Sequence, residues 1–245
     1  MAINTGFVNE KDFRKYLNKK RFCDLNENFQ KFLKFITKQE EFSGEITCVK
    51  AQSGQKPDCI IIINEKRYPI SLKCGSGNSV HQEKFEMFLN FLENIDFPQE
   101  AISLLKYYHY ADGTDNDTGT MRLSSREYIH QNPEKIKKLN TFLNSEKFVK
   151  KILDRVLFIG KSDEYETAEF LYHGSLASGL WASRDELLTN LPVINESSVN
   201  VAFLTYQPWG RNQDFSAVHP DRRYVSQFKF GSCSETLKEI RKNND

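Results

Sequence analysis

The fold is decided by the stretch from Lys56 to Glu86, which reads KPDCIIIINEKRYPISLKCGSGNSVHQEKFE. It holds two strand patterns, the β-branched run DCIIIIN and the segment EKRYPISLKCG, and the alternating segment GEITCVKA lies just before it. Only Asn64 to Lys66 separate the two runs, so we expect an antiparallel hairpin. Ile60 to Ile63 are apolar on both faces of their strand, which predicts a central place in the sheet.

Helical periodicity surrounds these strands. Two amphipathic helices are expected at residues 9–20 and 24–38, and a third after GSGNS, capped by Asn78 or Ser79 and running through Leu92. The later elements expected are a helix after Pro98, a helical region Ser124–Ile152 opened by a capping box of Ser124 and Glu127, strands Val156–Ile159 and Glu169–Tyr172, a helix Arg184–Leu191, the strand pair VNVAFLTYQ and RRYVSQFKF, and a final helix Ser234–Lys242. This order predicts an α/β layered fold around a mixed sheet.

Composition excludes several classes of protein. The chain has 245 residues, and its 34 Lys and Arg against 33 Asp and Glu exclude an acidic tail and a globally basic protein. No long apolar run and no apolar leader are present, so we expect neither a membrane span nor a secretory signal, and a cytoplasmic location. Five cysteines without CxxC spacing argue against a zinc knuckle and a disulfide framework, and predict reduced, mostly buried thiols.

The chemistry of the chain centres on Asp58 and Lys73. Asp58 stands at the entrance of one expected strand and Lys73 at the exit of the next, so a hairpin brings both side chains to one end of the sheet. A carboxylate placed there can bind a hard divalent cation through oxygen. An ammonium beside it can orient a water for attack.

Pro57-Asp58, an apolar strand, a turn and Ser71-Leu72-Lys73 together resemble the PD-(D/E)xK nuclease superfamily, which has the restriction-endonuclease-like fold. The resemblance covers residues 24–94, with Val156–Ile159 a candidate for the next core strand. It implies a mixed β-sheet flanked by helices, a Mg²⁺ cofactor and hydrolysis of phosphodiester bonds.

The chain departs from the family pattern at Ser71, where the family has Asp or Glu two residues before the lysine. Some restriction enzymes of the superfamily carry Ser-x-Lys and take the missing glutamate from the following helix. Glu83 and Glu86 lie in the helix expected here, one turn apart and on one face. The resemblance therefore implies Asp58 with Glu83 or Glu86 as metal ligands, Lys73 as the residue that activates water, and Gln82 as a residue lining the site.

The first-helix region offers a further carboxylate, as it often does in the family. Glu27, Glu40, Glu41 and Glu45 are candidates, and we prefer Glu45, although plain surface charge explains them equally well. His81 could contact phosphate or act as an acid or base, or simply be a hydrogen-bonded residue at a helix start. The amides of GSGNS could contact a DNA phosphate.

The C-terminal third mixes aromatic, amide and basic side chains, as nucleic-acid readers do. We single out Gln207, Arg211, Arg222 and Arg223 as candidate substrate-binding residues; the alternative is that the aromatics are core anchors and the arginines are solvated. A second basic cluster that could follow a duplex backbone consists of Lys11, Arg14, Lys15, Lys19, Lys20 and Arg21.

Other motifs are weaker. The loop ADGTDNDTGT has Arg126 where an EF-hand has its glutamate. GSGNS lacks the P-loop signature, and LYHGSLASG lacks the nucleophile elbow of α/β hydrolases. The same segment has a Tyr-His-Gly step like that of some ADP-ribosyltransferases, but too little chain follows for that fold.

We therefore expect one domain over residues 1–245, with a core of residues 24–94 plus 153–174, a helical insert over 98–152 and a C-terminal extension over 183–245 that carries a β-hairpin. The expected function is that of a Mg²⁺-dependent DNA endonuclease of a restriction or related defence system, acting as a homodimer; RNA as the substrate stays open. The alternative is a catalytically inactive nucleic-acid-binding module on the same fold.

Overall fold

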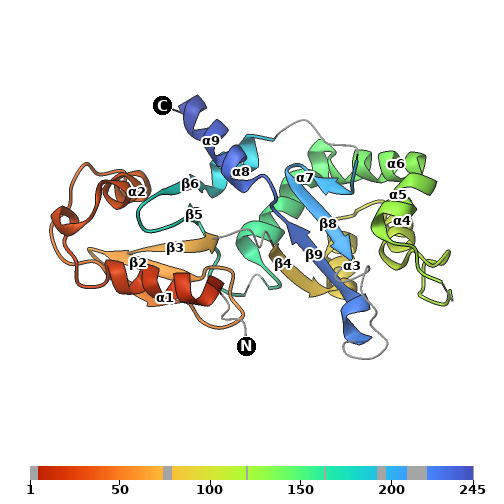
Figure 1. Cartoon of the computed structure of the whole chain (residues 1–245), viewed down its shortest axis with the longest axis horizontal. Coiled ribbons are helices and arrows are strands. Elements are labelled where there is room, and N and C mark those ends of the chain that lie inside the picture. Colours follow the sequence, from red (N-terminus) through yellow and green to blue (C-terminus); the bar gives the residue numbers. More distant parts are fainter. Residues whose placement is uncertain are drawn as a thin grey trace. The chain divides into compact units, whose positions relative to one another are not determined.

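The computed structural model describes residues 5–73, 79–119, 121–162, 164–191, 197–208 and 220–244. The chain forms two compact units (Figure 1). The first unit contains Met1–Asn78, Asp154–Asn190 and Ser232–Asp245, and the second contains Ser79–Leu153 and Leu191–Gly231. The expected core segment 24–94 is thus divided after residue 78 between the two units.

The first unit is built on a mixed five-stranded sheet with the order β1-β2-β3-β5-β6. Strands β1 to β3 are antiparallel neighbours, β3 and β5 are parallel, and β5 and β6 are antiparallel. Its elements are α1 (Thr5–Leu17), η1 (Phe22–Asp24), α2 (Glu27–Thr37), β1 (Thr47–Lys50), β2 (Cys59–Ile63), β3 (Lys66–Lys73), η2 (Arg155–Ile159), β5 (Phe170–Gly174), β6 (Gly179–Ser183), α8 (Arg184–Thr189) and α9 (Cys233–Asn244).

The expected hairpin is confirmed. Asn64 and Glu65 form the two-residue turn between β2 and β3, and both have positive φ values, 48° and 66°. Two left-handed residues give the turn that suits the right-handed twist of paired strands. Strand β2 has neighbours on both sides and is buried along its length apart from Ile62, as its four consecutive isoleucines predict.

An aromatic core holds α1 and α2 against this sheet. Tyr172 of β5 stacks on Phe29 of α2 at 5.8 Å and meets Phe13 of α1 at 5.2 Å between ring centroids. The Tyr172 hydroxyl also donates a 2.6 Å hydrogen bond to the carbonyl of Ser175 and accepts one of 2.8 Å from Asn28 Nδ2. Gly179 lies so close to this hydroxyl that a Cβ there would collide with it.

The second unit contains an antiparallel four-stranded sheet with the order β4-β9-β8-β7. Its elements are β4 (Ser79–Lys84), α3 (Phe85–Asn94), α4 (Gln99–Tyr110), α5 (Ser125–Gln131), α6 (Pro133–Leu143), α7 (Glu146–Asp154), β7 (Asn200–Val201), β8 (Leu204–Pro208), η3 (Pro220–Tyr224) and β9 (Val225–Lys229). Asp154, the last residue of α7, is already assigned to the first unit. The expected strand pair of the C-terminal third is confirmed in part: β8 and β9 pair, but the first expected strand is divided into β7 and β8, and the second begins in η3.

Buried His109 organises this unit. Its ring stacks on Phe85 with 3.7 Å between centroids. Its Nδ1 lies 2.6 Å from the Tyr206 hydroxyl, and its Nε2 lies 2.9 Å from the carbonyl oxygen of Arg223. The histidine therefore links α4 to β8 and to the segment that precedes β9.

Two expectations about secondary structure are wrong. Residues from Val80 were expected in a helix, but Ser79–Lys84 is strand β4, and the helix starts only at Phe85. Antiparallel pairing with β9 outweighs the helical pattern. Val156–Ile159 was expected as a strand but lies in the helical turn η2, because Asp154 before it keeps helical dihedral angles.

Two further regions follow the sequence closely. The region from Ser124 to Ile152 forms three helices rather than one, with a break at Pro133, which takes the first position of α6. Ser124 and Glu127 form the expected capping box. The parallel neighbour of β3 is β5, which overlaps the expected strand Glu169–Tyr172 and extends to Gly174.

The cysteine thiols are free wherever the structure describes them: Cys48, Cys59 and Cys233 are buried and Cys23 is exposed. Cys74 lies outside the described residues. Within the described ranges, no helix is long and apolar enough to cross a membrane.

Burial raises the pKa of Tyr172 to about 12, with the Asn28 hydrogen bond acting in the opposite direction. A raised phenol pKa gives stability that is complete below pH 10 and is lost as the pH rises towards 12. We expect Tyr172→Phe to cost about 1 to 3 kcal/mol at neutral pH, because Asn28 loses its acceptor. We also expect the urea midpoint of the Tyr172→Phe variant to fall less than that of the wild type between pH 10 and 12. Equal decline in both proteins would contradict this assignment.

Candidate active site

Asp58 is held at the end of the first sheet by the hairpin. Its amide donates to the carbonyl of Ile70 at 2.9 Å, one residue before β2 begins. Its carboxylate oxygen Oδ2 accepts hydrogen bonds from the Leu72 amide at 2.6 Å, from Ser71 Oγ at 3.4 Å and from Lys73 Nζ at 3.3 Å. The structure therefore brings together Asp58, Ser71 and Lys73, as the hairpin predicts.

The ion pair between Asp58 and Lys73 is accessible. The two side chains are 25% and 21% exposed, so the pair is sheltered but open to solvent.

Two titratable side chains are neighbours of Lys73. Lys73 lies beside His173 in the parallel pairing of β3 and β5. Burial, together with the Lys73 charge, lowers the pKa of His173, while Glu235 acts against both. Burial raises the pKa of Cys233, another neighbour of Lys73, to about 12, so its thiol stays protonated.

Helix α1 carries a second carboxylate, Glu10, whose pKa is affected by the charge of Asp58. Burial and then the charge of Asp58 raise the pKa of Glu10, while the charges of Arg14, Lys73 and Lys50 lower it. Two carboxylates close enough to repel one another, with cations around them, form an arrangement that suits a bound divalent cation.

Glu10 was not among the carboxylates expected from the sequence. The preferred candidate, Glu45, is exposed in the loop before β1, and Glu27 and Glu40 pair with lysines of α2. A signal was present: Glu10 and Arg14 share the helical stripe of buried Phe13 and Leu17. Charged residues on an apolar stripe indicate that the helix covers something polar.

Arg14 carries an unsatisfied donor near these carboxylates. Its Nη1 is buried and has no hydrogen-bond partner in the part of the chain that the structure describes. The charge of Arg14 acts on Glu10 and on Cys59, the residue after Asp58. A buried guanidinium donor without an acceptor is costly, and a phosphate oxygen would satisfy it.

The carboxylates at this place suit Mg²⁺ better than they suit a metal ion that takes all its ligands from protein side chains. Among the described residues, no group of three or more His, Cys, Asp or Glu side chains could hold a metal ion. Mg²⁺ commonly uses only one or two carboxylates and completes its shell with water and substrate phosphate. Asp58 and Glu10 meet that requirement. Ser71 is fully buried, and its hydroxyl contacts Asp58.

The expected glutamates belong to the second unit, and they do not share a helix face. Glu83 lies on β4, where its buried carboxylate is 2.9 Å from Nε2 of His81. Glu86 lies in the first turn of α3, is exposed, and lines a cavity of about 680 Å³. The prediction that both project from one helix is therefore wrong, because β4 extends as far as Lys84.

Three glutamine side chains line up across the second sheet. Gln82, Gln227 and Gln207 occupy paired positions on β4, β9 and β8 and form a row across the second sheet. Gln82 and Gln227 both donate to Ser79 Oγ, at 3.3 Å and 3.0 Å. Two members of this row, Gln82 and Gln207, are residues that we expected from the sequence to contact substrate.

The arginines of that region have different positions. Arg223 is ion-paired with Asp117, and its carbonyl oxygen contacts His109, so it has a structural role in the second unit. Arg222 is partly buried in η3. Arg211 lies outside the described residues, as do most residues of the GSGNS segment.

Comparisons of the chain with protein-family models, with curated proteins and with solved structures find no match. The site must therefore be interpreted from its own geometry.

If Glu10 and Asp58 hold Mg²⁺, the ion should stabilise the folded chain. At a concentration about a hundredfold above its Kd, a ligand adds about 2.7 kcal/mol to the free energy of unfolding. We expect Mg²⁺ to raise the melting temperature of the wild type, and this increase to be lost in Asp58→Asn and Glu10→Gln. Glu45→Gln, a change at an exposed carboxylate, is the matched control. Equal Mg²⁺ shifts in all four proteins would exclude these ligands.

Proposed function

We propose that the chain is a Mg²⁺-dependent endonuclease that hydrolyses DNA phosphodiester bonds and that its first unit has the restriction-endonuclease-like fold. The observation that carries the proposal is the ion pair of Asp58 and Lys73 at one end of the five-stranded sheet, and the charge of Asp58 also contributes to the raised pKa of Glu10. The order of a helix, three antiparallel strands and a fourth strand parallel to the third supports it. A role in a restriction or related defence system follows from the same resemblance.

In this proposal Asp58 and Glu10 would hold the cation. A bound Mg²⁺ supplies positive charge that offsets the charge building up on the phosphate. The Leu72 amide and the Ser71 hydroxyl fix the Asp58 carboxylate in place, so little reorganisation is needed. The Lys73 ammonium orients the attacking water, whose oxygen forms the new bond to phosphorus while the bond to the departing oxygen breaks.

In the first unit, substrate would be held by cations near the Asp58–Lys73 pair. Arg14 offers an unpaired donor for a phosphate, and exposed Lys11 and Lys15 extend the basic surface of α1. Glutamine amides can pair with base edges, so Gln82 and Gln207 remain our candidates for reading sequence. Cleavage of both strands would favour a homodimer with two-fold symmetry.

A second candidate is a nucleic-acid-binding module that has lost catalysis. Two observations favour it: Ser71 replaces an acidic residue, and the buried Glu83 carboxylate is already bound to His81. In that case the Asp58–Lys73 pair would be structural. The two candidates differ in one measurable property, the cleavage of DNA in the presence of Mg²⁺.

We expect the wild type to cleave plasmid DNA with Mg²⁺ and to be inactive with EDTA. Asp58→Asn and Lys73→Ala should each lower the rate by at least about a hundredfold, because each removes a group acting on the reacting atoms. Lys66→Ala, at the exposed opposite end of β3, is the matched control and should keep the wild-type rate. Absence of cleavage by a folded wild type that still binds DNA would favour the inactive module.

A phosphate contact by Arg14 should appear in the salt dependence of binding. We expect Arg14→Ala, in the Asp58→Asn background, to reduce the slope of log K against log salt by about one unit. Lys161→Ala removes an exposed cation elsewhere in the first unit and should leave the slope unchanged. Identical slopes for the two variants would show that Arg14 does not neutralise a phosphate.

A further inference from the structure

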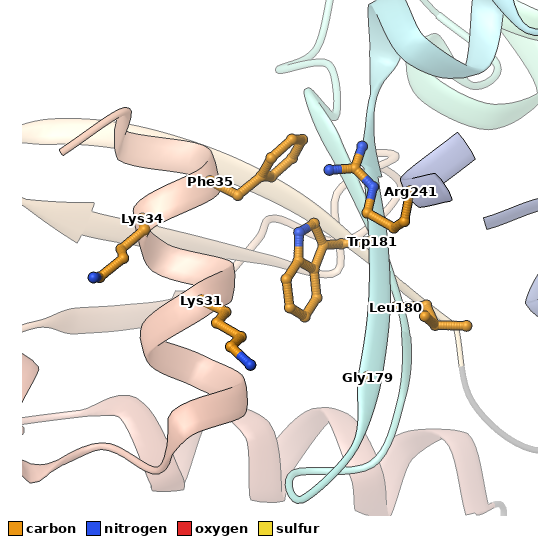
Figure 2. A pocket seen from close by; sticks show the side chains of 7 residues that line it. All are labelled: Lys31, Lys34, Phe35, Gly179, Leu180, Trp181 and Arg241. Atoms are coloured by element: carbon orange, nitrogen blue, oxygen red, sulfur yellow. The ribbon is translucent and has the colours of Figure 1, made fainter. Parts of the chain in front are cut away.

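A pocket lies in the first unit, and none of its lining residues belongs to the Asp58–Lys73 pair. It has a volume of about 540 Å³ and is lined by α2, the start of β6 and α9 (Figure 2). Lys31, Lys34 and Phe35 come from α2, Trp181 from β6 and Arg241 from α9. Its size is that of sites that hold one small molecule.

An aromatic wall forms the inner side of this pocket. The Trp181 indole is stacked on Tyr172 at 6.2 Å with an interplanar angle of 11°, and it lies 5.4 Å from Phe32 and 6.5 Å from Phe35 between centroids. These contacts fix the orientation of the indole. No hydrogen bond to its Nε1 is found among the described residues, so one donor remains available.

Arg241 adds a cation to the aromatic wall. Its guanidinium carbon lies 4.5 Å from the centroid of the Phe35 ring, and one of its terminal nitrogens is ion-paired with Glu186. Its Nε is buried and has no acceptor within the described ranges. A buried donor without a partner is unfavourable, and a ligand oxygen would satisfy it.

Two lysines complete the positive side of the pocket. Lys31 pairs with Glu27 at 2.6 Å and Lys34 with Glu40 at 2.7 Å, and all four side chains are solvent-exposed. Exposed ion pairs of this kind contribute little, so a phosphate can compete for either ammonium. The polar side chains that line the pocket are thus all donors and include no carboxylate.

We propose that this pocket binds a nucleotide, with the base against Trp181 and the phosphate at Lys31 or Arg241, which lie on opposite sides of the indole (Figure 2). A planar ring fits the aromatic wall, and an anion fits a lining of cations and unpaired donors. A neutral apolar ligand would leave the Arg241 donor unsatisfied. The proposal does not depend on the proposed cleavage activity, because it uses none of the residues assigned to that site.

The nucleotide could come from two sources, free in solution or as part of a single strand. Isothermal titration calorimetry distinguishes them with four probes: adenosine monophosphate, adenosine, inorganic phosphate and a short oligodeoxyadenylate with blocked ends. We use the full-length Asp58→Asn protein so that no strand is cut. We expect the monophosphate to bind with a Kd below about 1 mM and at least tenfold more tightly than adenosine or phosphate alone.

Comparison of the monophosphate with the oligonucleotide identifies the source. Binding of the monophosphate alone indicates a free nucleotide, and binding of the oligonucleotide, with or without the monophosphate, indicates a unit of a strand. Absence of saturation by both probes overturns the proposal. Equal affinity for adenosine and its monophosphate also overturns it, since the cations would then have no role.

Variants show whether binding occurs in this pocket. Trp181→Leu and Lys31→Ala should each lower the affinity for whichever of the monophosphate and the oligonucleotide binds more tightly. For Trp181→Leu the loss should be at least tenfold, because stacking is lost. Lys31 is exposed, so its variant tests the site even if Trp181→Leu fails to fold. Lys161→Ala, an exposed lysine of the first unit outside the pocket, is the control. Unchanged affinity in Lys31→Ala and in folded Trp181→Leu would place the ligand elsewhere and overturn the proposal.

The fluorescence of Trp181 tests stacking directly. The variant Trp209→Phe leaves Trp181 as the sole tryptophan, and we expect the bound probe to quench its fluorescence. Absence of quenching would contradict stacking.

Discussion

The backbone hydrogen bonds between β2 and β3 fix which side chains can meet at the end of the first sheet. The turn at Asn64 and Glu65 sets Cys59 opposite Ile70, which places Asp58 beside Ser71. A slip of one residue would turn every side chain of one strand to the other face. The Leu72 amide then holds the Asp58 carboxylate at 2.6 Å, so the position of the acid depends on backbone geometry more than on its partner lysine.

Local patterns in the sequence were enough to predict the parts of this fold that local forces decide. The β-branched run of β2, the turn that follows it and the capping box at Ser124 all depend on residues close together in the chain. The position of Asp58 beside Lys73 follows from the same hairpin. The proximity of Asp58 and Lys73 can therefore be predicted from the sequence alone.

The remaining features depend on contacts between distant segments. The segment HQEKF after Val80 has helix-forming residues, but pairing with β9 draws it into a strand. Glu10 joins Asp58 only because the buried Phe13 and Leu17 hold α1 against the sheet. No spacing in the sequence relates residue 10 to residue 58, so sequence analysis selected Glu45 instead. The pocket likewise combines α2, β6 and α9, which lie far apart in the chain.

The candidate active site and the pocket share one end of the sheet. Lys73 is paired with His173 on β5, and His173 is paired with Leu180 on β6. Neighbouring strands lie about 4.8 Å apart, so the backbone at Leu180 is about 10 Å from that at Lys73. The Asp58–Lys73 pair and the pocket are thus separated by the width of β5.

The interleaving of the two units has a consequence for synthesis on the ribosome. Strands β1 to β3 emerge early, but β5 and β6 follow only after the segment Ser79–Leu153, and α9 follows last. The pairing of β3 with β5 closes a loop of about a hundred residues, which makes it a slow step. Until then the nascent chain carries β3 as an open edge, a template for mispairing with other chains. Lys73, at the end of that edge, can meet Asp58 as soon as the hairpin forms, but it gains its neighbour His173 only when β5 pairs.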